Sequence, residues 1–270
     1  MISCGLMPEI RRKRDCNMLQ FFIICPMMFL AGFVDAIAGG GGLISLPAYI
    51  IAGVPVHFAL GTNKLASAMG TTVSTVRYLK NGYLKGKEMI HLAAVACIIS
   101  LLGSQIGSRL SLLVSDQVLK HMMIVILPIV AFYVLRNKQL GASEEKAPLS
   151  AKATCLITIA AAFVVGGYDG FYGPGAGTFI LLILTGAARL GVRQAAALTK
   201  LINLSSNVSA LITFLLTGNV YFSLGLAAGG FCIAGHYIGS GLVVQNGQKI
   251  VRPVILIVLT ILFVKILTGA

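Results

Sequence analysis

Residues 31–42 read AGFVDAIAGGGG, and residues 165–177 read VGGYDGFYGPGAG. Each stretch places one aspartate, Asp35 or Asp169, inside an apolar run and just ahead of a cluster of glycines. A helix continues poorly through several glycines, and Pro174 also lacks the backbone N–H that an α-helix needs. The two stretches therefore predict two apolar helices that each break just after an aspartate.

The composition excludes an ordinary soluble domain. Of the 270 residues, 57% are hydrophobic and only 11% are charged, and the mean hydropathy is +0.92; soluble domains have about 25% charged residues. Since a spanning helix needs roughly 20 mostly apolar residues, we expect an all-α polytopic membrane protein with about eight transmembrane helices. Two further apolar segments, 41–56 and 175–187, are short, and we expect them to be broken or re-entrant helices.

The basic charge of the chain does not indicate nucleic-acid binding. The formal net charge is +13, but Lys and Arg lie mostly in short loops between apolar runs, where cytoplasmic loops and anionic lipid headgroups favour them. We therefore expect membrane lipids, and no nucleic acid, as partners. The six cysteines lack the spacing of a metal site and no nucleotide-binding motif is present, so we expect no cofactor and no metal.

The two halves of the sequence match in order, which indicates an internal repeat. The matched positions include Asp35 with Asp169, Gly39 with Gly173, Lys64 with Lys200, Gly103 with Gly235, and Gly107 with Gly239. The predicted organisation is a basic N-terminal tail (1–17), transmembrane repeat 1 (18–136), a polar linker (137–152) and transmembrane repeat 2 (153–270).

The relative direction of the two repeats is left open by the sequence. If each break and its short segment together make one crossing, the repeats are parallel; if they form a hairpin, the repeats are inverted. The charges of the loops favour a cytoplasmic N-terminus, which goes with the first arrangement, but they do not decide between the two.

Only two of the eight acidic residues lie inside apolar stretches, and these are Asp35 and Asp169. A charge at membrane depth costs at least ~2.5 kcal/mol, so two such charges at matching positions indicate a functional role. We expect them to balance buried positive charges or to carry protons. The alternative is that each aspartate caps a helix end at the membrane interface.

The glycine clusters themselves are candidate anion-binding sites. The short helix after each break begins with free N–H groups and the positive end of its dipole, which favour anions. Interrupted helices at matching positions in two repeats mark transporter sites. The alternative is close helix packing through small residues. The candidate substrate-binding residues of the two breaks are Gly39, Gly40, Gly41, Gly42, Gly173, Pro174, Gly175 and Gly177.

Two lysines, Lys64 and Lys200, lie in otherwise apolar predicted helices. At helical spacing each lysine shares one face with polar residues, and such a face is expensive against lipid, so both faces are expected to point into the bundle. Alternatively, each lysine extends to the nearby interface. The candidate substrate-binding residues of this group are Asn63, Lys64, Ser67, Thr199, Lys200 and Asn203.

Two G-x-x-x-G pairs, Gly103 with Gly107 and Gly235 with Gly239, predict close helix crossings. His236 lies beside the second pair. We interpret it as a structural, hydrogen-bonded histidine, with a role in proton relay as the alternative.

These features favour a secondary transporter of small anions, with a positive site between the two repeats and with the aspartates as charge partners or proton carriers. An intramembrane enzyme is disfavoured because neither HExxH nor GxSxG is present. A channel, or a carrier for another small anion such as a short carboxylate, is the alternative.

Three segments together resemble the TauE/SafE sulfite exporter family: AGFVDAIAGGGGLISLPAYIIAGVPVHFALGTNKLAS (31–67), GPGAGTF (173–179) and ALTKLINLSSN (197–207). The resemblance extends from about residue 20 to residue 268. It implies a multi-pass transporter of the cell inner membrane that moves sulfite, organosulfonates or related small anions. It also implies roles for the two glycine clusters and for the Asn63-Lys64 and Thr199-Lys200 pairs. The substrate, the direction of transport and the formation of a homo-oligomer are left open.

Overall fold

The computed structural model describes residues 17–119, 121–122, 125 and 149–246, and every regular element within these ranges is helical. Most of the predicted N-terminal tail (1–17) and polar linker (137–152), and the ends of both predicted repeats, lie outside them. The helices of the first half are α2 (Met18–Ala38), α3 (Gly42–Ile51), α4 (Val56–Lys80) and α5 (Lys87–Leu113). Those of the second half are α7 (Ala151–Phe171), α8 (Ala176–Leu182) with the π-helical turn η1 (Ile183–Ala187), α9 (Val192–Leu216) and α10 (Phe222–Asn246).

Five of the described helices are long and apolar enough to cross a membrane: α2, α5, α7, α9 and α10. Helix α4 is just as long at 25 residues, but it is more polar because it carries Lys64, Arg77 and Lys80. Helices α3 and α8 are too short to span. The all-helical prediction is thus confirmed for the described residues, with five candidate spans among them.

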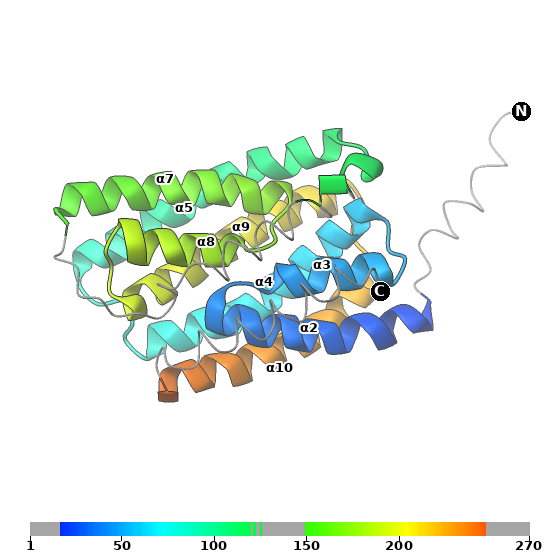
Figure 1. The fold of residues 1–270 in the computed structure, drawn as a ribbon, viewed down its shortest axis with the longest axis horizontal. Coiled ribbons are helices and arrows are strands. Elements are labelled where there is room, and N and C mark those ends of the chain that lie inside the picture. Colours follow the sequence, from blue (N-terminus) through cyan, green and yellow to red (C-terminus); the bar gives the residue numbers. More distant parts are fainter. Residues whose placement is uncertain (1–16, 120, 123–124, 126–148, 247–270) are drawn as a thin grey trace, which may run out of the picture.

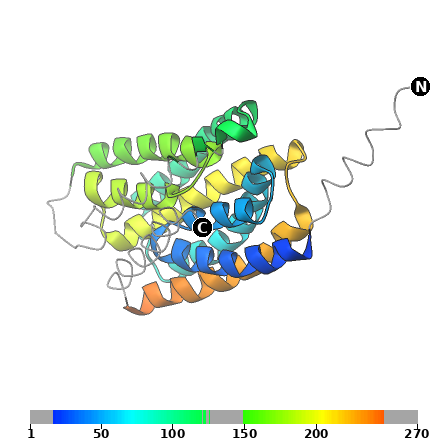
Figure 2. The same ribbon diagram turned by 45° about the vertical axis from the view of Figure 1, so that its right-hand side comes forward.

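The long helices form two groups that run in opposite directions (Figures 1 and 2). Helices α2, α4 and α10 run one way, and α5, α7 and α9 run the other way. Helices α4 and α9, which carry the two matched lysines, cross antiparallel, since Lys64 contacts Asn207 while Gly61 faces Phe214. Helices that correspond in sequence therefore run in opposite directions.

Each short helix turns back along the helix before it. At the start of α3, Gly41 packs against Asp35, and beyond its end the Ala52 carbonyl accepts a hydrogen bond from Gln20 at the start of α2 (3.3 Å). In the second half, Thr154 near the start of α7 donates to the carbonyl of Ala188 beyond η1 (3.3 Å). Of the two arrangements that the sequence allowed, the structure has the hairpin. The loop charges could not decide between them, because each arrangement leaves a similar excess of basic residues on one side.

The fourth helix of each half packs against the other half. Helix α5 lies along α7, where Gly103 and Gly107 approach the carbonyls of Phe163 and Gly167. Helix α10 lies along α2 in the same way, with Gly235 against Phe29 and Gly239 against Phe33. A methyl group at any of these four glycines would overlap the facing backbone, so the absence of a side chain lets these helices touch. The predicted close crossings are present, and each joins the two halves.

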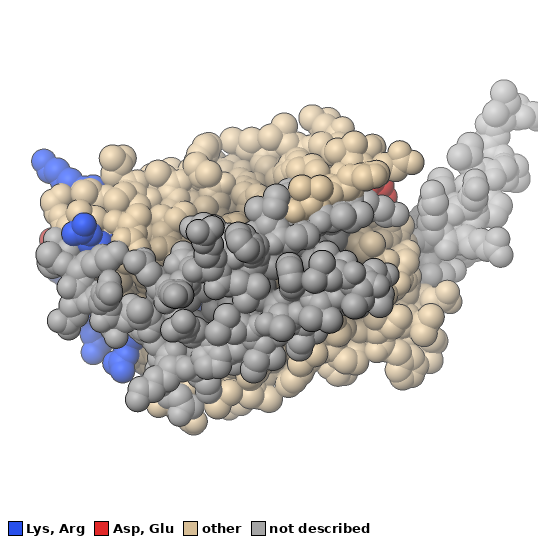
Figure 3. All heavy atoms as spheres, in the orientation of Figure 1, with Lys and Arg blue, Asp and Glu red and all other residues tan. Residues whose placement is uncertain are grey.

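Basic side chains gather at one end of the bundle (Figure 3). The loop from α4 to α5, the start of α7 and the start of α9 meet there, since Arg193 lies over the ring of Tyr83 and Lys87 and Lys152 line a common hollow. Helix α2 begins at the opposite end (Figure 1). The exposed basic residues of this end are Lys80, Lys85, Lys87, Lys152, Arg189 and Arg193.

Candidate functional site

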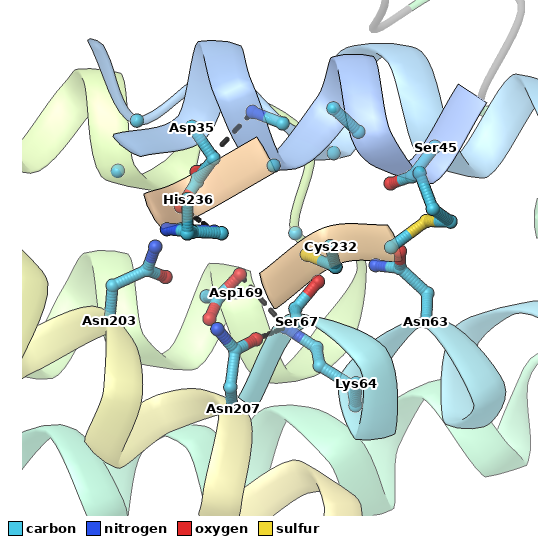
Figure 4. Close-up of a pocket in the computed structure, with 18 residues that line it drawn as sticks. Asp35, Ser45, Asn63, Lys64, Ser67, Asp169, Asn203, Asn207, Cys232 and His236 are labelled. Atoms are coloured by element: carbon cyan, nitrogen blue, oxygen red, sulfur yellow. Dashed lines mark hydrogen bonds and ion pairs between the residues drawn. The ribbon is translucent and has the colours of Figure 1, made fainter. Parts of the chain in front are cut away.

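A small polar cavity lies where the two glycine breaks meet (Figure 4). Its volume is about 30 Å³, enough for about two water molecules. It is lined from α2, α3, α4, α7, α8, α9 and α10 and from the two breaks, so residues from both halves face it. The labelled polar side chains in Figure 4 point toward one another from these helices.

The two breaks are joined by their backbones. The N–H of Thr178 in α8 donates to the carbonyl of Gly39 (3.2 Å), and the Thr178 hydroxyl donates to the carbonyl of Ala38 (2.9 Å). Gly39 has a φ of +78°, and a methyl group there would overlap the backbone of Gly177. Glycine is thus required at position 39 both for its left-handed conformation and for this contact.

Two buried ion pairs border the cavity, and each joins one half of the chain to the other. Lys64 Nζ lies 2.9 Å from Asp169 Oδ1, and Lys200 Nζ lies 2.9 Å from Asp35 Oδ2. Both lysines are only 3% exposed, so neither extends to the surface. Burying a charge in an apolar bundle is costly unless it is paired and hydrogen-bonded, and the crossed pairs meet that requirement.

The Asp169 pair is completed by hydroxyl and amide groups. Lys64 also donates to Asn207 Oδ1 (3.0 Å), and the hydroxyl of Ser206 donates to Asp169 Oδ2. Ser104 in α5 donates to the backbone carbonyl of Ser206. Among the described side chains, Asp169 thus has a cation and a neutral donor as partners.

The Asp35 pair is completed by an imidazole. His236 Nε2 lies 3.4 Å from Asp35 Oδ2, and His236 Nδ1 lies 3.0 Å from the Ser74 hydroxyl. The N–H of Gly41 donates to Asp35 Oδ1 (3.3 Å), so the break after α2 holds the protein's own carboxylate. In the match between the two halves, His236 corresponds to Ser104, and Gly70 corresponds to Ser206. A methyl group at position 70 would overlap the ring of His236.

Several buried polar atoms near the cavity have no hydrogen-bond partner within the described part of the chain. They include Asn63 Oδ1 and Ser45 Oγ, whose residues line the cavity, and Thr199 Oγ1. An unpaired buried polar atom is costly and calls for an explanation, of which a bound ligand is one.

Sequence comparison gives the context for this site. The chain matches the family described as "Sulfite exporter TauE/SafE" over residues 24–266. The chain belongs to the TauE/SafE family. The "Probable membrane transporter protein ORF9" of Sinorhizobium sp is 34% identical over 251 residues, 93% of each chain. The "Probable membrane transporter protein YfcA" of Escherichia coli K12 is 32% identical over 257 residues, 92% of this chain and 93% of that protein.

A third TauE/SafE relative, a "Probable membrane transporter protein" of Haemophilus influenzae, is 32% identical over 231 residues, 85% of this chain and 87% of its own. No solved structure matches this TauE/SafE chain significantly. The family resemblance inferred from the three segments is confirmed, and the chain is a multi-pass membrane transporter.

Most of the residues singled out from the sequence line the cavity of this TauE/SafE transporter. Five do not: Gly40, Pro174, Gly175, Thr199 and Lys200. Lys200 nonetheless binds Asp35, which does. Those that line the cavity are Asp35, Gly39, Gly41, Gly42, Asn63, Lys64, Ser67, Asp169, Gly173, Gly177 and Asn203.

The expectation of free N–H groups at the start of α3 holds only in part. The N–H groups of Leu43, Ile44 and Ser45 already bond to carbonyls of the preceding glycines, and that of Gly41 bonds to Asp35. The glycines shape the backbone, while the side chains supply most of the polar atoms around the cavity.

Some lining residues of this TauE/SafE site were absent from the sequence-based selection. Ser45 follows its glycine cluster closely, but a lone serine in an apolar segment gives no signal of its own. The sequence singled out His236, but its position opposite α2 follows only from the packing of α10. The cavity residues outside the selection are Met28, Ala31, Gly32, Ser45, Asn207, Cys232 and His236.

Proposed function

We propose that this chain is a secondary transporter of small anions, of the sulfite or organosulfonate type, that works by alternating access at the cavity between its two halves. The observation that carries the proposal is the pair of buried lysines, Lys64 and Lys200, at a junction of two broken helices. Each lysine is held by an aspartate of the other half. An anion that takes the place of an aspartate would keep its lysine paired.

The helix directions support an inverted repeat. Helices that correspond in sequence run in opposite directions, and the close contacts of α5 on α7 recur as those of α10 on α2. Inverted repeats with interrupted helices at the repeat interface are a recurring design of secondary transporters. Rocking of one group of helices against the other would expose the cavity to each side in turn.

The size of the cavity supports a small cargo. A space of about 30 Å³ among mostly buried residues fits a small ion better than a wide pore. This favours a carrier over a channel. A short carboxylate shares the charge and size of a small sulfur oxyanion, so it is the alternative cargo.

The position of the basic end supports an orientation in the cell inner membrane. By the rule that basic loops stay in the cytoplasm, the end with the α4–α5 loop and the start of α7 faces inward. Helix α2 then begins on the opposite side. This differs from the cytoplasmic N-terminus that the loop charges favoured, because the hairpin reverses the direction of the later helices.

Exchange assays in proteoliposomes test the proposal. Purified protein loaded with unlabelled sulfite, thiosulfate, methanesulfonate or acetate should take up the same labelled anion by exchange. The variant Lys64→Met with Asp169→Asn removes one ion pair without leaving a buried charge alone, and it should fold but lose exchange. Unchanged exchange in this variant, or equal flux for cations, would contradict an anion site at the lysines.

A further inference from the structure

The two ends of the cavity differ in one titratable group. At the Asp169 end, Ser104 and Ser206 occupy the positions that His236 and Gly70 occupy at the Asp35 end. Gly70 leaves room for the imidazole, since a methyl group there would lie 2.5 Å from His236 Cδ2. Only the Asp35 end therefore places an imidazole against its carboxylate.

The hydrogen bonds around His236 fix which ring nitrogen carries the proton. The Ser74 hydroxyl donates to the carbonyl of Thr71 (3.1 Å), so it can only accept from His236 Nδ1 (3.0 Å). In the neutral imidazole, Nε2 then has a lone pair. This lone pair faces Asp35 Oδ2 at 3.4 Å. His236 Nε2 and Asp35 Oδ2 are thus two acceptors that face each other, and together they form a binding site for one additional proton.

The other charged and titratable groups around His236 come from its own helix and from the helices packed against it. From α2 it faces Asp35, from α9 Lys200, and from its own helix Cys232. Helix α4 contributes Ser74 and, one turn farther, Arg77 and Tyr78. The Tyr78 hydroxyl donates to the carbonyl of Ala36 (2.7 Å). Arg77 lies over the ring of Tyr237 and donates to the Ser240 hydroxyl. Across the cavity lie Lys64 and Asp169.

The charges of the cavity then set the stoichiometry. With two lysines, two aspartates and a neutral imidazole, its formal charge is zero. One additional proton makes it +1, and one bound monoanion restores zero. Since an uncompensated charge is costly in a low-dielectric interior, proton and monoanion stabilise each other's binding.

We propose that Asp35 and His236 form the proton-binding site that couples transport, with one proton moved per monoanion in the same direction. The proton binds between Nε2 and Oδ2, which weakens the hold of Asp35 on Lys200 and leaves the ammonium charge to be balanced by the anion. When the anion leaves, the proton leaves and the ion pair re-forms. This inference rests on the proposed anion transport and assigns its coupling to one end of the cavity.

Two assays on the same proteoliposomes separate coupling from transport. Exchange of labelled methanesulfonate at equal pH needs no net proton movement, whereas accumulation driven by a pH gradient does. Methanesulfonate stays ionised near neutral pH, so it carries no proton itself. With one proton per monoanion, a gradient of one pH unit should drive about tenfold accumulation of the anion in the alkaline compartment, because protons flow from the acidic to the alkaline side.

His236→Gln removes the imidazole lone pair and should lower the pH-driven accumulation from about tenfold to about onefold. Because His236 also lines the cavity, the accumulation is compared at the exchange rate that the variant retains. Gly70→Ala, which displaces the imidazole, should act in the same direction. The matched control is His91→Gln, because His91 is exposed on α5 and is not among the residues that line the cavity. This control should retain both activities.

Each other outcome rejects a distinct statement. Wild-type protein that exchanges none of sulfite, thiosulfate, methanesulfonate and acetate would overturn the proposed function. Exchange without pH-driven accumulation, or accumulation that survives in His236→Gln, would overturn the coupling site alone. Loss of exchange in both variants would assign His236 a structural role and also overturn the coupling site.

Discussion

The two ends of the cavity share a framework and differ in chemistry. Both have an aspartate from a broken helix paired at 2.9 Å with a lysine of the opposite half. Around Asp169 the remaining donors are neutral, with Ser206 as the direct contact. Around Asp35 the Gly41 N–H is a donor, and the imidazole of His236 also lies against the carboxylate.

The backbone arrangement of the site and its proposed ability to bind a proton therefore depend on different residues. The arrangement is set by the glycines and by the crossed ion pairs, which recur at both ends. In the proposed coupling, the response to protons depends on two positions, which hold two serines at one end and a glycine with a histidine at the other. A duplicated framework can thus hold two ends that behave differently.

The largest effect should come from breaking the ion pairs one partner at a time. Lys64→Met leaves Asp169 as a lone buried charge and should cost ~3–5 kcal/mol of unfolding free energy. Adding Asp169→Asn should restore most of that stability. Lys200→Met should cost less than Lys64→Met, because Asp35 keeps the Gly41 N–H and can share a proton with His236 Nε2. Thermal unfolding in detergent measures all three, and equal losses at both lysines would contradict the asymmetry.

A smaller effect is expected where the two breaks join. Gly39→Ala should lose ~1–2 kcal/mol from its positive φ and a further ~1–3 kcal/mol from overlap with Gly177. Gly53 is the matched control, because it has nearly the same φ, +76°, with nothing within 4 Å of a methyl group. Gly53→Ala should show only the first loss. If both variants unfold at the same temperature, the junction contributes no packing constraint.

The close crossings should respond next. Gly107→Ala should cost ~3 kcal/mol and Gly239→Ala ~1–2 kcal/mol, since the methyl group meets the facing carbonyl more closely at Gly107. Gly230→Ala is the control on α10, where a methyl group meets nothing within 4 Å, and it should be neutral or slightly stabilising. Unfolding midpoints of the three variants measure the order, and a reversed order would show that α5 adjusts more easily than α10.

The smallest effect concerns the neutral partner of Asp169. Ser206→Ala should cost ~1.5 kcal/mol, because it removes one hydrogen bond to a charged group while Lys64 remains. Stability measurements together with exchange assays check this. Cysteine at position 206, which fills the space with a weaker donor, should lie between serine and alanine.

The sequence was sufficient for the helices and for much of the cavity lining, because apolar periodicity and isolated charges in apolar runs are local signals. It was insufficient for the partners. That Lys64 meets Asp169 and not Asp35 depends on α4 and α9 crossing antiparallel, which no local pattern encodes. The hairpin at each break was equally invisible, since glycine allows both a continued crossing and a reversal. The proposed proton-binding role of His236 depends on the packing of α10 against α2 and α4, which no local sequence pattern encodes.

The exchange of fourth helices between the halves has a consequence for biosynthesis. When α2 and α4 have entered the membrane, their partner α10 has not yet been made, and Asp35 still lacks Lys200. The first half therefore cannot reach its final packing on its own, and neither can the second, because α7 and α9 need α5. Assembly must wait for nearly the whole chain, and two separately synthesised halves should become stable only when both are present in the same membrane.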